Sequence, residues 1–368
     1  MSKTLEQIIG YESLTRVITS PDGGVPTDLL PPGFMTLTTP NPGNTAVWNV
    51  LASSRKNAGT DNYGSASKRI DKETAGQRSA TMLHTFKHIS HPAATLMKLK
   101  AFDSPERQIK GQQEVDRQTA EFRRKLNNQR MSAIYSVLRH GIIYRDADGN
   151  ILPSSSGETA GLRVDMGVPS GNKNQLDVFG SGAIIGASWA TTTTKIHTQI
   201  ANIKKASRKK TGRKIVHAFY GEDILDYLLK NDNIKQLLNS NSALATAFAG
   251  NEIPNGFLGL QWHPVSEAFF EDSSGTNQDW FAGDIIVFTP EPDPSWWTMN
   301  EGSYMVPTSV GNVSADGTAA LGDLAEVTGM FSYAKVNDDP PGIKHFMGDT
   351  FLPTLLDPGA IFIADVIP

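Results

Sequence analysis

Three histidines stand at spacings that could form a metal site. His84, His88 and His91 follow one another at intervals of four and three residues, which would place them on one face of a helix. A zinc site normally needs a fourth ligand, and the helical protease motif needs a glutamate directly after its first histidine. Thr85 stands at that position, and Pro92 ends the segment. We therefore expect surface or interface histidines here, and no bound metal.

The acidic stretch that contains Asp146 and Asp148 resembles the start of a calcium-binding loop. Such a loop needs glycine at its sixth position and a bidentate glutamate at its twelfth. Ile151 and Gly157 stand at those two positions. An Asp-Gly pair between short apolar runs is instead a strong signal for a tight turn, so Asp148–Gly149 predicts a β-hairpin.

Gly180, Gly182 and Gly186 form a loosened version of the dinucleotide-binding fingerprint. The full pattern needs a clean strand, a following helix and an acidic residue about 20 positions further on. The next acidic residue is Glu222. The sequence also has no G-x-S-x-G motif and no Gly-Lys dipeptide for a phosphate loop. We expect no enzyme, no catalytic residues and no cofactor, and a dinucleotide enzyme stays as a third alternative.

The composition of the chain, and above all its lack of cysteine, limits the kinds of site and protein that it can form. The chain has 368 residues, of which 39% are hydrophobic and none is Cys, and this excludes disulfides, thiolate zinc sites and thiol catalysis. Its length and apolar share suit two or three compact units. The longest apolar stretch, 182–190, is about half of a membrane span. The first residues lack an apolar signal core, so we expect neither membrane insertion nor secretion.

The net charge of −4 hides a strong segregation of charge along the chain. Residues 53–100 carry a net charge of +6, residues 195–214 carry +8, and residues 251–368 carry −15. A folded monomer could bring these blocks together internally. A protein that assembles with copies of itself could instead use them between subunits, where charge complementarity fixes the register of contact.

The second basic block could contact nucleic acid. Its candidate DNA-facing residues are Lys204, Lys205, Arg208, Lys209 and Lys210, which could pair with phosphates. No aromatic residue is interleaved for base stacking, and no recognition motif accompanies the run. A solvated helix face is therefore favoured, and a soluble nucleic-acid-binding protein that uses residues 195–214 remains the main alternative function.

The first eighty residues contain two segments with little capacity to build a core. Residues 20–45 contain six prolines and four glycines, which exclude a helix interior and disfavour a strand ladder. This composition predicts an extended arm that lies over another surface. Residues 53–80 are basic and rich in small polar residues, so they predict a protruding loop.

A long helix is expected next. Asp103-Ser104-Pro105-Glu106 is a helix-start signal, and Gly141 provides a C-terminal cap after His140. Apolar residues recur mostly at three- and four-residue steps between Val115 and Leu138, which predicts one buried stripe. About 35 residues would span roughly 50 Å, so this helix would be a structural spine.

The remaining signals describe a mixed α+β protein. After the hairpin, residues 161–168 alternate like a strand, a helix should follow Lys195, and a strand is expected at Ile215–Phe219. A second helix is expected over Glu222–Leu238. Short strands between Pro- and Gly-rich turns should follow; their signals are FLGLQW, DIIVFT and AIFIADVI.

The order of these elements resembles the major capsid proteins of tailed bacteriophages, specifically the family typified by lambda capsid protein E. Four segments carry the resemblance: LRHGIIYRDADGNIL with LRVDMGVP, HAFYGEDILDYLLKNDNIKQLL, FLGLQWHPV with GDIIVFTP, and PPGIKHFMGDTFLPTLLDPGAIFIADVI. They cover roughly residues 100–368, whereas the first hundred residues match in layout.

The resemblance implies the tailed-phage capsid fold, with an N-terminal arm, an extended β-loop, a peripheral domain that holds the spine helix, and an axial domain. The implied boundaries are 1–52 for the arm, 53–103 for the extended loop, 104–175 for the peripheral domain with spine helix and hairpin, 176–310 for the axial domain, and 311–368 for the return strands.

The implied function is that of a major capsid protein, which self-assembles from pentamers and hexamers into the icosahedral shell around a tailed phage's double-stranded DNA. About fifty residues precede the loop, so a separate scaffolding protein is implied, with a portal and possible decoration proteins as further partners. The implied location is the virion capsid, assembled in the cytoplasm of the bacterial host.

The charge pattern suggests how neighbouring subunits would meet. We expect the basic loop to dock on the acidic C-terminal third of an adjacent subunit. The expected interface residues are Arg55, Lys56, Lys68, Arg69, Lys72 and Arg78.

Overall fold

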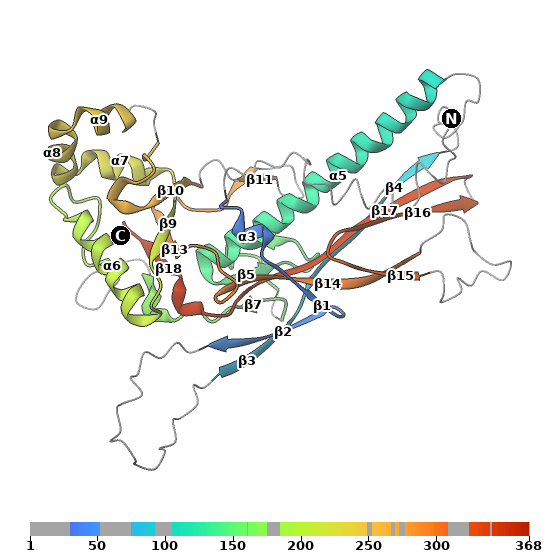
Figure 1. Cartoon of the computed structure of the whole chain (residues 1–368), viewed down its shortest axis with the longest axis horizontal. Coiled ribbons are helices and arrows are strands. Elements are labelled where there is room, and N and C mark those ends of the chain that lie inside the picture. Colours follow the sequence, from blue (N-terminus) through green and yellow to red (C-terminus); the bar gives the residue numbers. More distant parts are fainter. Residues whose placement is uncertain are drawn as a thin grey trace, which may run out of the picture.

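A computed structural model describes ten segments of the chain. They comprise residues 30–51, 75–92, 105–159, 161–174, 185–248, 252–265, 269–271, 277–307, 324–338 and 341–367. The structure is mixed α+β, as the sequence predicts (Figure 1). Two large hydrophobic cores lie within it, one around the larger sheet and the spine helix and one around a smaller sheet covered by helices.

The larger sheet has six strands and is elongated. Its members are β1 (Thr38–Asn41), β4 (Leu83–Pro92), β14 (Trp297–Pro307), β15 (Leu324–Thr328), β16 (Phe331–Asp338) and β17 (Pro341–Leu355). The 15-residue β17 is the central strand. Its first half pairs with β16 and β4, and its second half pairs with β14.

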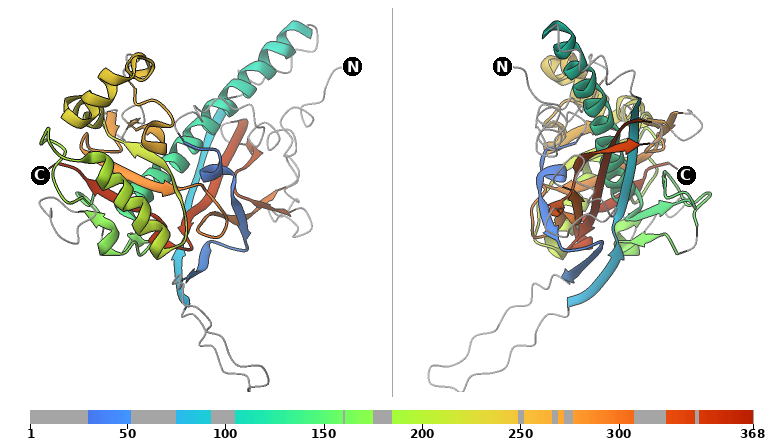
Figure 2. Two further views of the ribbon diagram at one scale, coloured as in Figure 1. Left: turned by 60° about the vertical axis from the view of Figure 1, so that its left-hand side comes forward. Right: turned by 90° about the vertical axis from the view of Figure 1, so that its right-hand side faces the viewer.

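The spine helix α5 (Pro105–His140) runs along one face of this sheet, beside β4 and β17 (Figures 1 and 2). Its 36 residues give a length of about 54 Å. The described C-terminal half buries Leu126, Ile134 and Leu138, which confirms the predicted apolar stripe. Gly141 adopts a positive φ of 65° and its N–H bonds to the Val137 carbonyl, which ends the helix where the sequence predicts.

Two smaller β units extend from the larger sheet. A hairpin of β2 (Thr45–Leu51) and β3 (Ala75–Thr81) projects away from the body at the lower edge of Figure 1. A three-stranded sheet follows the spine helix and contains β5 (Ile142–Arg145), β6 (Ile151–Leu152) and β7 (Val164–Asp165). The β5–β6 pair confirms the hairpin predicted at Asp148–Gly149.

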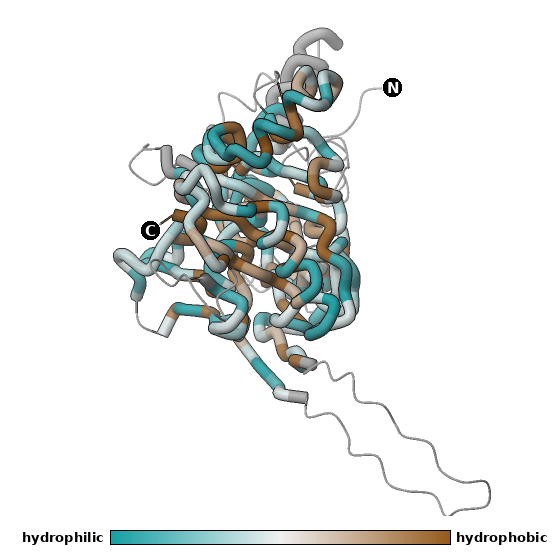
Figure 3. Tube along the Cα trace, turned by 90° about the vertical axis from the view of Figure 1, so that its left-hand side faces the viewer, coloured by the Kyte–Doolittle hydropathy of each residue, from teal (hydrophilic) through white to brown (hydrophobic). Residues whose placement is uncertain are grey.

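The smaller sheet has five strands in the order β10-β9-β13-β18-β8. Their bounds are β8 (Lys173–Asn174), β9 (Ile215–Tyr220), β10 (Gln261–Pro264), β13 (Ile285–Pro290) and β18 (Phe362–Asp365). β9 confirms the strand predicted there, and β13 is buried from Ile286 onward. Apolar residues run through the middle of this part of the chain, while the outer helices carry more hydrophilic residues (Figure 3).

Four helices and short turns surround the smaller sheet. They are α6 (Ile196–Lys210), α7 (Asp223–Lys230), α8 (Asp232–Ser240) and α9 (Ser242–Phe248), with the 3-10 turns η2 (Ser170–Asn172), η3 (Phe257–Gly259) and η5 (Pro358–Ala360). A two-stranded unit, β11 (Phe269–Glu271) with β12 (Asn277–Asp279), completes the strands. Within the described segments, no helix combines the length and apolarity needed to cross a membrane.

Aromatic packing joins the start of the described chain to the larger sheet. Phe34, in the short helix α3 (Gly33–Thr36), meets the rings of Phe219, Trp296 and Trp297 edge-on at 5.0–6.0 Å. Trp297 also donates from Nε1 to the Phe34 carbonyl at 3.0 Å. The chain therefore enters the core at Leu30–Phe34.

Several sequence predictions were wrong in detail. The Pro-rich stretch does contribute a strand, because β1 pairs in parallel with β14 at an outer position where prolines are tolerated. The helix predicted over 222–238 is two helices, since Asn231 leaves helical geometry and its side chain accepts from the N–H groups of Asn233 and Ile234 to cap α8. FLG in FLGLQW is a 3-10 turn, and residues 161–168 form a strand only at Val164–Asp165.

Candidate functional site

The six interface residues predicted from the basic loop lie mostly outside the described residues. Arg55, Lys56, Lys68, Arg69 and Lys72 belong to that group. Arg78 lies on β3 and is half-buried. Its guanidinium donates to the Asp165 carbonyl at 2.7 Å and covers Gly167, where a Cβ would overlap it. Arg78 therefore fastens the β2–β3 hairpin to β7 of its own chain.

The basic segment 195–214 forms α6, which confirms the helix predicted after Lys195. Ile196, Ile200 and Ile203 face the smaller sheet. Lys204 donates to the carbonyls of Leu258 and Gly259, so it serves the structure. The side chains of Lys205, Arg208 and Lys209 are exposed.

Lys210 takes part in a junction between several chain segments. Its ammonium donates to the side-chain oxygen of the buried Asn172. The Asn172 amide in turn donates to the carbonyls of Gly359 and Ile361 at 2.8 and 2.9 Å. This junction joins the end of α6 to η2 and to the chain that links the two sheets.

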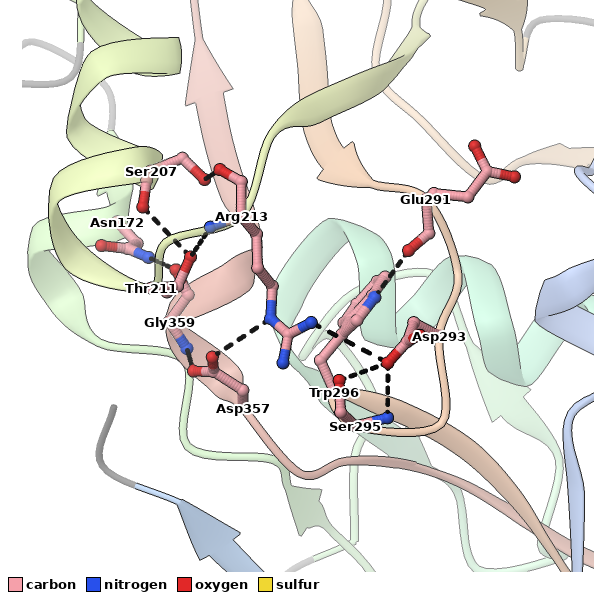
Figure 4. A network of polar contacts seen from close by, with 10 residues as sticks. All are labelled: Asn172, Ser207, Thr211, Arg213, Glu291, Asp293, Ser295, Trp296, Asp357 and Gly359. Atoms are coloured by element: carbon pink, nitrogen blue, oxygen red, sulfur yellow. Dashed lines mark hydrogen bonds and ion pairs between the residues drawn. The ribbon is translucent and has the colours of Figure 1, made fainter. Parts of the chain in front are cut away.

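Arg213 extends the same junction. Its guanidinium lies 3.5 Å from the buried Asp357 and 3.9 Å from Asp293. Asp357 also accepts from the Gly359 N–H, and the Ser207 hydroxyl donates to the Arg213 carbonyl. Figure 4 shows these contacts converging from α6, from the turn before β14 and from η5. The geometry is that of a structural joint rather than of a substrate site.

A buried ion-pair network fixes the spine helix to the larger sheet. Arg130 lies on α5 and is buried. Its Nε and Nη2 donate to both carboxylate oxygens of Asp349 at 2.6 and 2.7 Å, and its Nη1 donates to Glu301 at 2.8 Å. Burial opposes the charge, but the fields and hydrogen bonds of Asp349 and Glu301 outweigh it and raise the pKa of Arg130.

Arg130 was not among the predicted site residues, although its position in the sequence carries a signal for burial. Arg130 stands four residues after Leu126 and four before Ile134, so it belongs to the apolar stripe that faces the sheet. A charged residue at such a position is buried only when it is paired. Its partners lie 171 and 219 residues away along the chain, and their identity cannot be read from local patterns.

A second network of polar contacts joins β9, β10 and the residue that follows β13 in the smaller sheet. His217 is buried and contacts His263 through Nδ1 and Glu291 through Nε2, both at 2.9 Å. Burial lowers the pKa of His217, against the attraction of Glu291. Burial and the neighbouring His217 lower the pKa of His263 to about 4. His217 therefore links the other two side chains, using one ring nitrogen for each contact.

The three spaced histidines do not share a helical face, so that expectation was wrong. They lie on β4, where side chains alternate between faces. His84 and His88 are exposed on one face, and His91 is buried on the other beside His345, at 6.3 Å between ring centroids. Pairing with β17 over ten residues holds this segment extended. Among the described residues, no three His, Asp or Glu side chains are grouped to hold a metal ion.

His345 gives the folded chain a pH dependence that can be measured. Burial, and then His91, lower the pKa of His345 to about 4, and its Nε2 meets the Ser332 hydroxyl at 2.7 Å. Since the unfolded chain has a histidine pKa of about 6.5, it binds more protons than the folded chain between pH 6.5 and 4. Stability is therefore full above pH 6.5 and falls as the pH is lowered through this window.

We expect His345 to account for a loss of about 2 kcal/mol in the free energy of unfolding between pH 7.5 and pH 5. Urea unfolding at the two pH values measures this loss. His345→Gln should shrink the difference between the two pH values, whatever it does to stability at pH 7.5. An unchanged difference in the variant would show that His345 does not carry the effect.

The dinucleotide alternative finds no site among the described residues. Gly180 and Gly182 lie outside them. Gly186 is described and sits in a turn with open space around it. The element that follows is α6, whose first turn carries no acidic residue.

Comparison with known families gives one match over nearly the whole chain. The sequence profile of the family described as "Phage major capsid protein E" matches residues 11–366. A search of curated proteins finds no match.

Several solved structures are similar to this chain over most of its length. A crystal structure described as a prophage capsid protein from E. coli CFT073 is 15% identical, with a TM-score of 0.53, and the match covers 97% of this chain and 99% of that one. A phage-related protein from Bordetella bronchiseptica RB50 is 10% identical, with a TM-score of 0.49 and 96% of both chains covered. The mature capsid of bacteriophage PhiM1 gives 10% identity, a TM-score of 0.42, and coverage of 90% and 86%. The fold assignment rests on the first of these.

Proposed function

Because the chain belongs to the phage major capsid protein E family, we propose that it builds the icosahedral head shell that encloses the double-stranded DNA of a tailed phage. Membership makes it a shell-forming structural subunit that assembles with copies of itself and resides in the virion capsid. The match over residues 11–366 is the observation that carries the proposal. The role requires no catalysis, since the work is geometric and many modest contacts add up around a closed shell.

The domain organisation follows the capsid plan in this proposal. Residues 1–52 serve as the arm, 53–103 as the extended loop, 104–175 as the peripheral domain, 176–310 as the axial domain and 311–368 as the return strands. Three observations support it: α5 fills half of the proposed peripheral segment, residues of α6 to α9 form a distinct core, and β17 and β18 return through both sheets. Residues 53–103 include β3, the second strand of the projecting β2–β3 hairpin, and the strand β4 that follows it.

The partners beyond the chain itself are also part of the proposal. A separate scaffolding protein guides assembly in the cytoplasm of the bacterial host, a portal occupies one vertex, and a decoration protein is an optional addition. The exposed Lys205, Arg208 and Lys209 on α6 supply a non-specific contact with packaged DNA. Lys204 and Lys210 contribute less to that contact because they bond within the chain.

The function is tested by producing the chain with its scaffolding protein and examining the product by size-exclusion chromatography and electron microscopy. Closed particles that elute near the void volume are expected. A monodisperse monomer near 40 kDa, with or without DNA bound, would contradict the proposal.

Charge removal in the extended loop should reduce shell formation. Replacing Arg55, Lys56, Lys68, Arg69 and Lys72 with Gln removes the charges that we expect to dock on a neighbour's acidic third, and should lower the yield of closed shells about tenfold. Electron microscopy counts the shells. Arg78→Gln is made separately, because Arg78 also holds β3 to β7. Normal yield from the five-residue variant would refute electrostatic docking.

A further inference from the structure

One face of the larger sheet carries an array of aromatic rings, which we call the aromatic face. It lies opposite the face that α5 covers, because Thr85 and Asp349 of the same strands contact Gln129 and Arg130 of the helix. The rings come from β4, β14, β16 and β17; they belong to His84, Phe86, His88, Tyr304, Phe331, Tyr333 and Phe346. Phe86 keeps 37% of its surface exposed, and His84 and His88 are exposed. Tyr304, Tyr333 and Phe346 are half-buried and Phe331 is buried beneath them, so ring surface gathers on this face of the described residues.

The rings present their edges outward. Tyr304 and Phe331 stack at 4.4 Å with only 3° between their planes, and Phe86 and Phe346 at 5.5 Å with 13°. Rings this close cannot lie flat beside one another on the sheet, so they stand upright. Ring edges carry partial positive charge, and they favour contact with carbonyl and carboxylate oxygens.

Two lysines extend this positive character at one end of the aromatic face. Segment 251–368 contains 17 acidic residues and only two lysines or arginines, Lys335 and Lys344. These two lysines nevertheless lie directly opposite each other on β16 and β17. Each stands two residues from a ring of the array, Tyr333 or Phe346, and so on the same face. Neither forms an ion pair with any described residue. Like charges opposed on neighbouring strands are destabilising, and an external anion would relieve the repulsion.

We propose that the aromatic face receives the N-terminal arm of a second copy of this chain, through residues 20–28. This segment reads SPDGGVPTD, and no basic residue occurs between Arg16 and Arg55. Its prolines favour an extended chain with unpaired carbonyls, the form in which Pro-rich segments bind aromatic surfaces. Asp22 and Asp28 supply the carboxylates for the lysine pair. The inference rests on the proposed function, since shell assembly is what brings a second copy into reach.

The reach of the chain argues against the subunit's own arm as occupant. The arm leaves the core near Phe34, beside Trp297, and Trp297 pairs with Leu355 at the far end of β17. Lys344 lies eleven residues from Leu355 along the strand, about 36 Å away. Asp28 is two residues from the buried Leu30 and can extend only about 7 Å from it. Asp22 is eight residues from Leu30 and could approach Lys344 only if that whole stretch, about 29 Å, were fully extended toward it.

Photo-crosslinking in assembled particles tests the contact directly. Phe86 is replaced with p-benzoylphenylalanine, and particles are assembled from a mixture of ¹⁴N- and ¹⁵N-labelled chains. We expect crosslinks from position 86 to the tryptic peptide 17–55, with mixed-label pairs that prove a second copy. The same probe at Leu237, exposed on α8, should not reach that peptide. Crosslinks to another segment, to another protein, to nucleic acid, or only within one copy would overturn the inference.

A charge swap provides the second test. Lys335→Glu/Lys344→Glu and Asp22→Lys/Asp28→Lys should each lower the particle yield about tenfold, and their combination should restore it to within about threefold. A charge-matched control, Lys230→Glu/Lys235→Glu, changes exposed lysines elsewhere and should leave the particle yield unchanged. Failure of the combination to restore assembly would overturn the arm contact. Failure of the unmodified chain to form particles would instead count against the proposed function.

Discussion

Replacing Arg130 with methionine is expected to lower the free energy of unfolding by about 3–5 kcal/mol, because it leaves the buried carboxylate of Asp349 without its charged partner. Asp349 is fully buried and receives two hydrogen bonds from the Arg130 guanidinium. Without them it must either keep an uncompensated charge in the core or take up a proton. Urea unfolding of the purified subunit, followed by tryptophan fluorescence, measures the loss.

The double variant Arg130→Met/Asp349→Leu separates the ion pair from the space that it fills. With both charges removed, an apolar pair of similar volume should recover most of the lost stability. Glu301 keeps 19% of its side chain exposed and can turn toward water. A double variant as unstable as Arg130→Met alone would mean that packing of α5, rather than charge pairing, dominates at this position. Arg130→Lys should fall between the two, since a single ammonium cannot reproduce the bidentate contact.

Gly221→Ala is expected to destabilise the smaller sheet by about 3 kcal/mol, through overpacking against rigid backbone. Gly221 joins β9 to α7, and its N–H bonds to the Ile285 carbonyl at 2.9 Å. A Cβ at this position would overlap the carbonyl oxygen of Ala282 and lie 2.7 Å from that of Gly283. Backbone oxygens held by their own hydrogen bonds cannot move aside without shifting β13.

Gly186→Ala is the matched control for this change. Gly186 has no heavy atom within 4 Å of the added methyl and no positive φ, so the substitution should leave the unfolding midpoint nearly unchanged. Thermal unfolding of both variants alongside the original chain makes the comparison. Equal stability of the two variants would contradict the close approach at Gly221.

Local signals in the sequence were sufficient for the elements that depend on near neighbours. The spine helix, its end at Gly141 and the β5–β6 hairpin are each encoded within a few residues. β4 was misread because its histidines repeat at a helical spacing, and its extended form is imposed by β17, some 250 residues later in the chain. Long-range pairing overrides local spacing in such a strand.

The contacts that hold the two sheets together at Asn172 and Arg213 could not be predicted from the sequence, for the same reason. Asn172 and Arg213 are unremarkable in the sequence, and their partners lie in the turn before β14 and in η5. Of the predicted interface residues, only Arg78 is described, and its contact is within its own chain. The docking of the basic loop therefore stays a prediction, whereas the family and the fold are confirmed.

The route of the chain through β17 and β18 has a consequence for synthesis. β17 is the central strand of the larger sheet, and β18 pairs with both β13 and β8 in the smaller one. Neither core can close until these strands have left the ribosome, and sequence-distant pairing of this kind is slow. A nascent or prematurely terminated chain would lack the middle of one sheet and an inner strand of the other. Only a chain translated through this segment can fold into a building block, so truncated products are excluded from the particle by their own failure to fold.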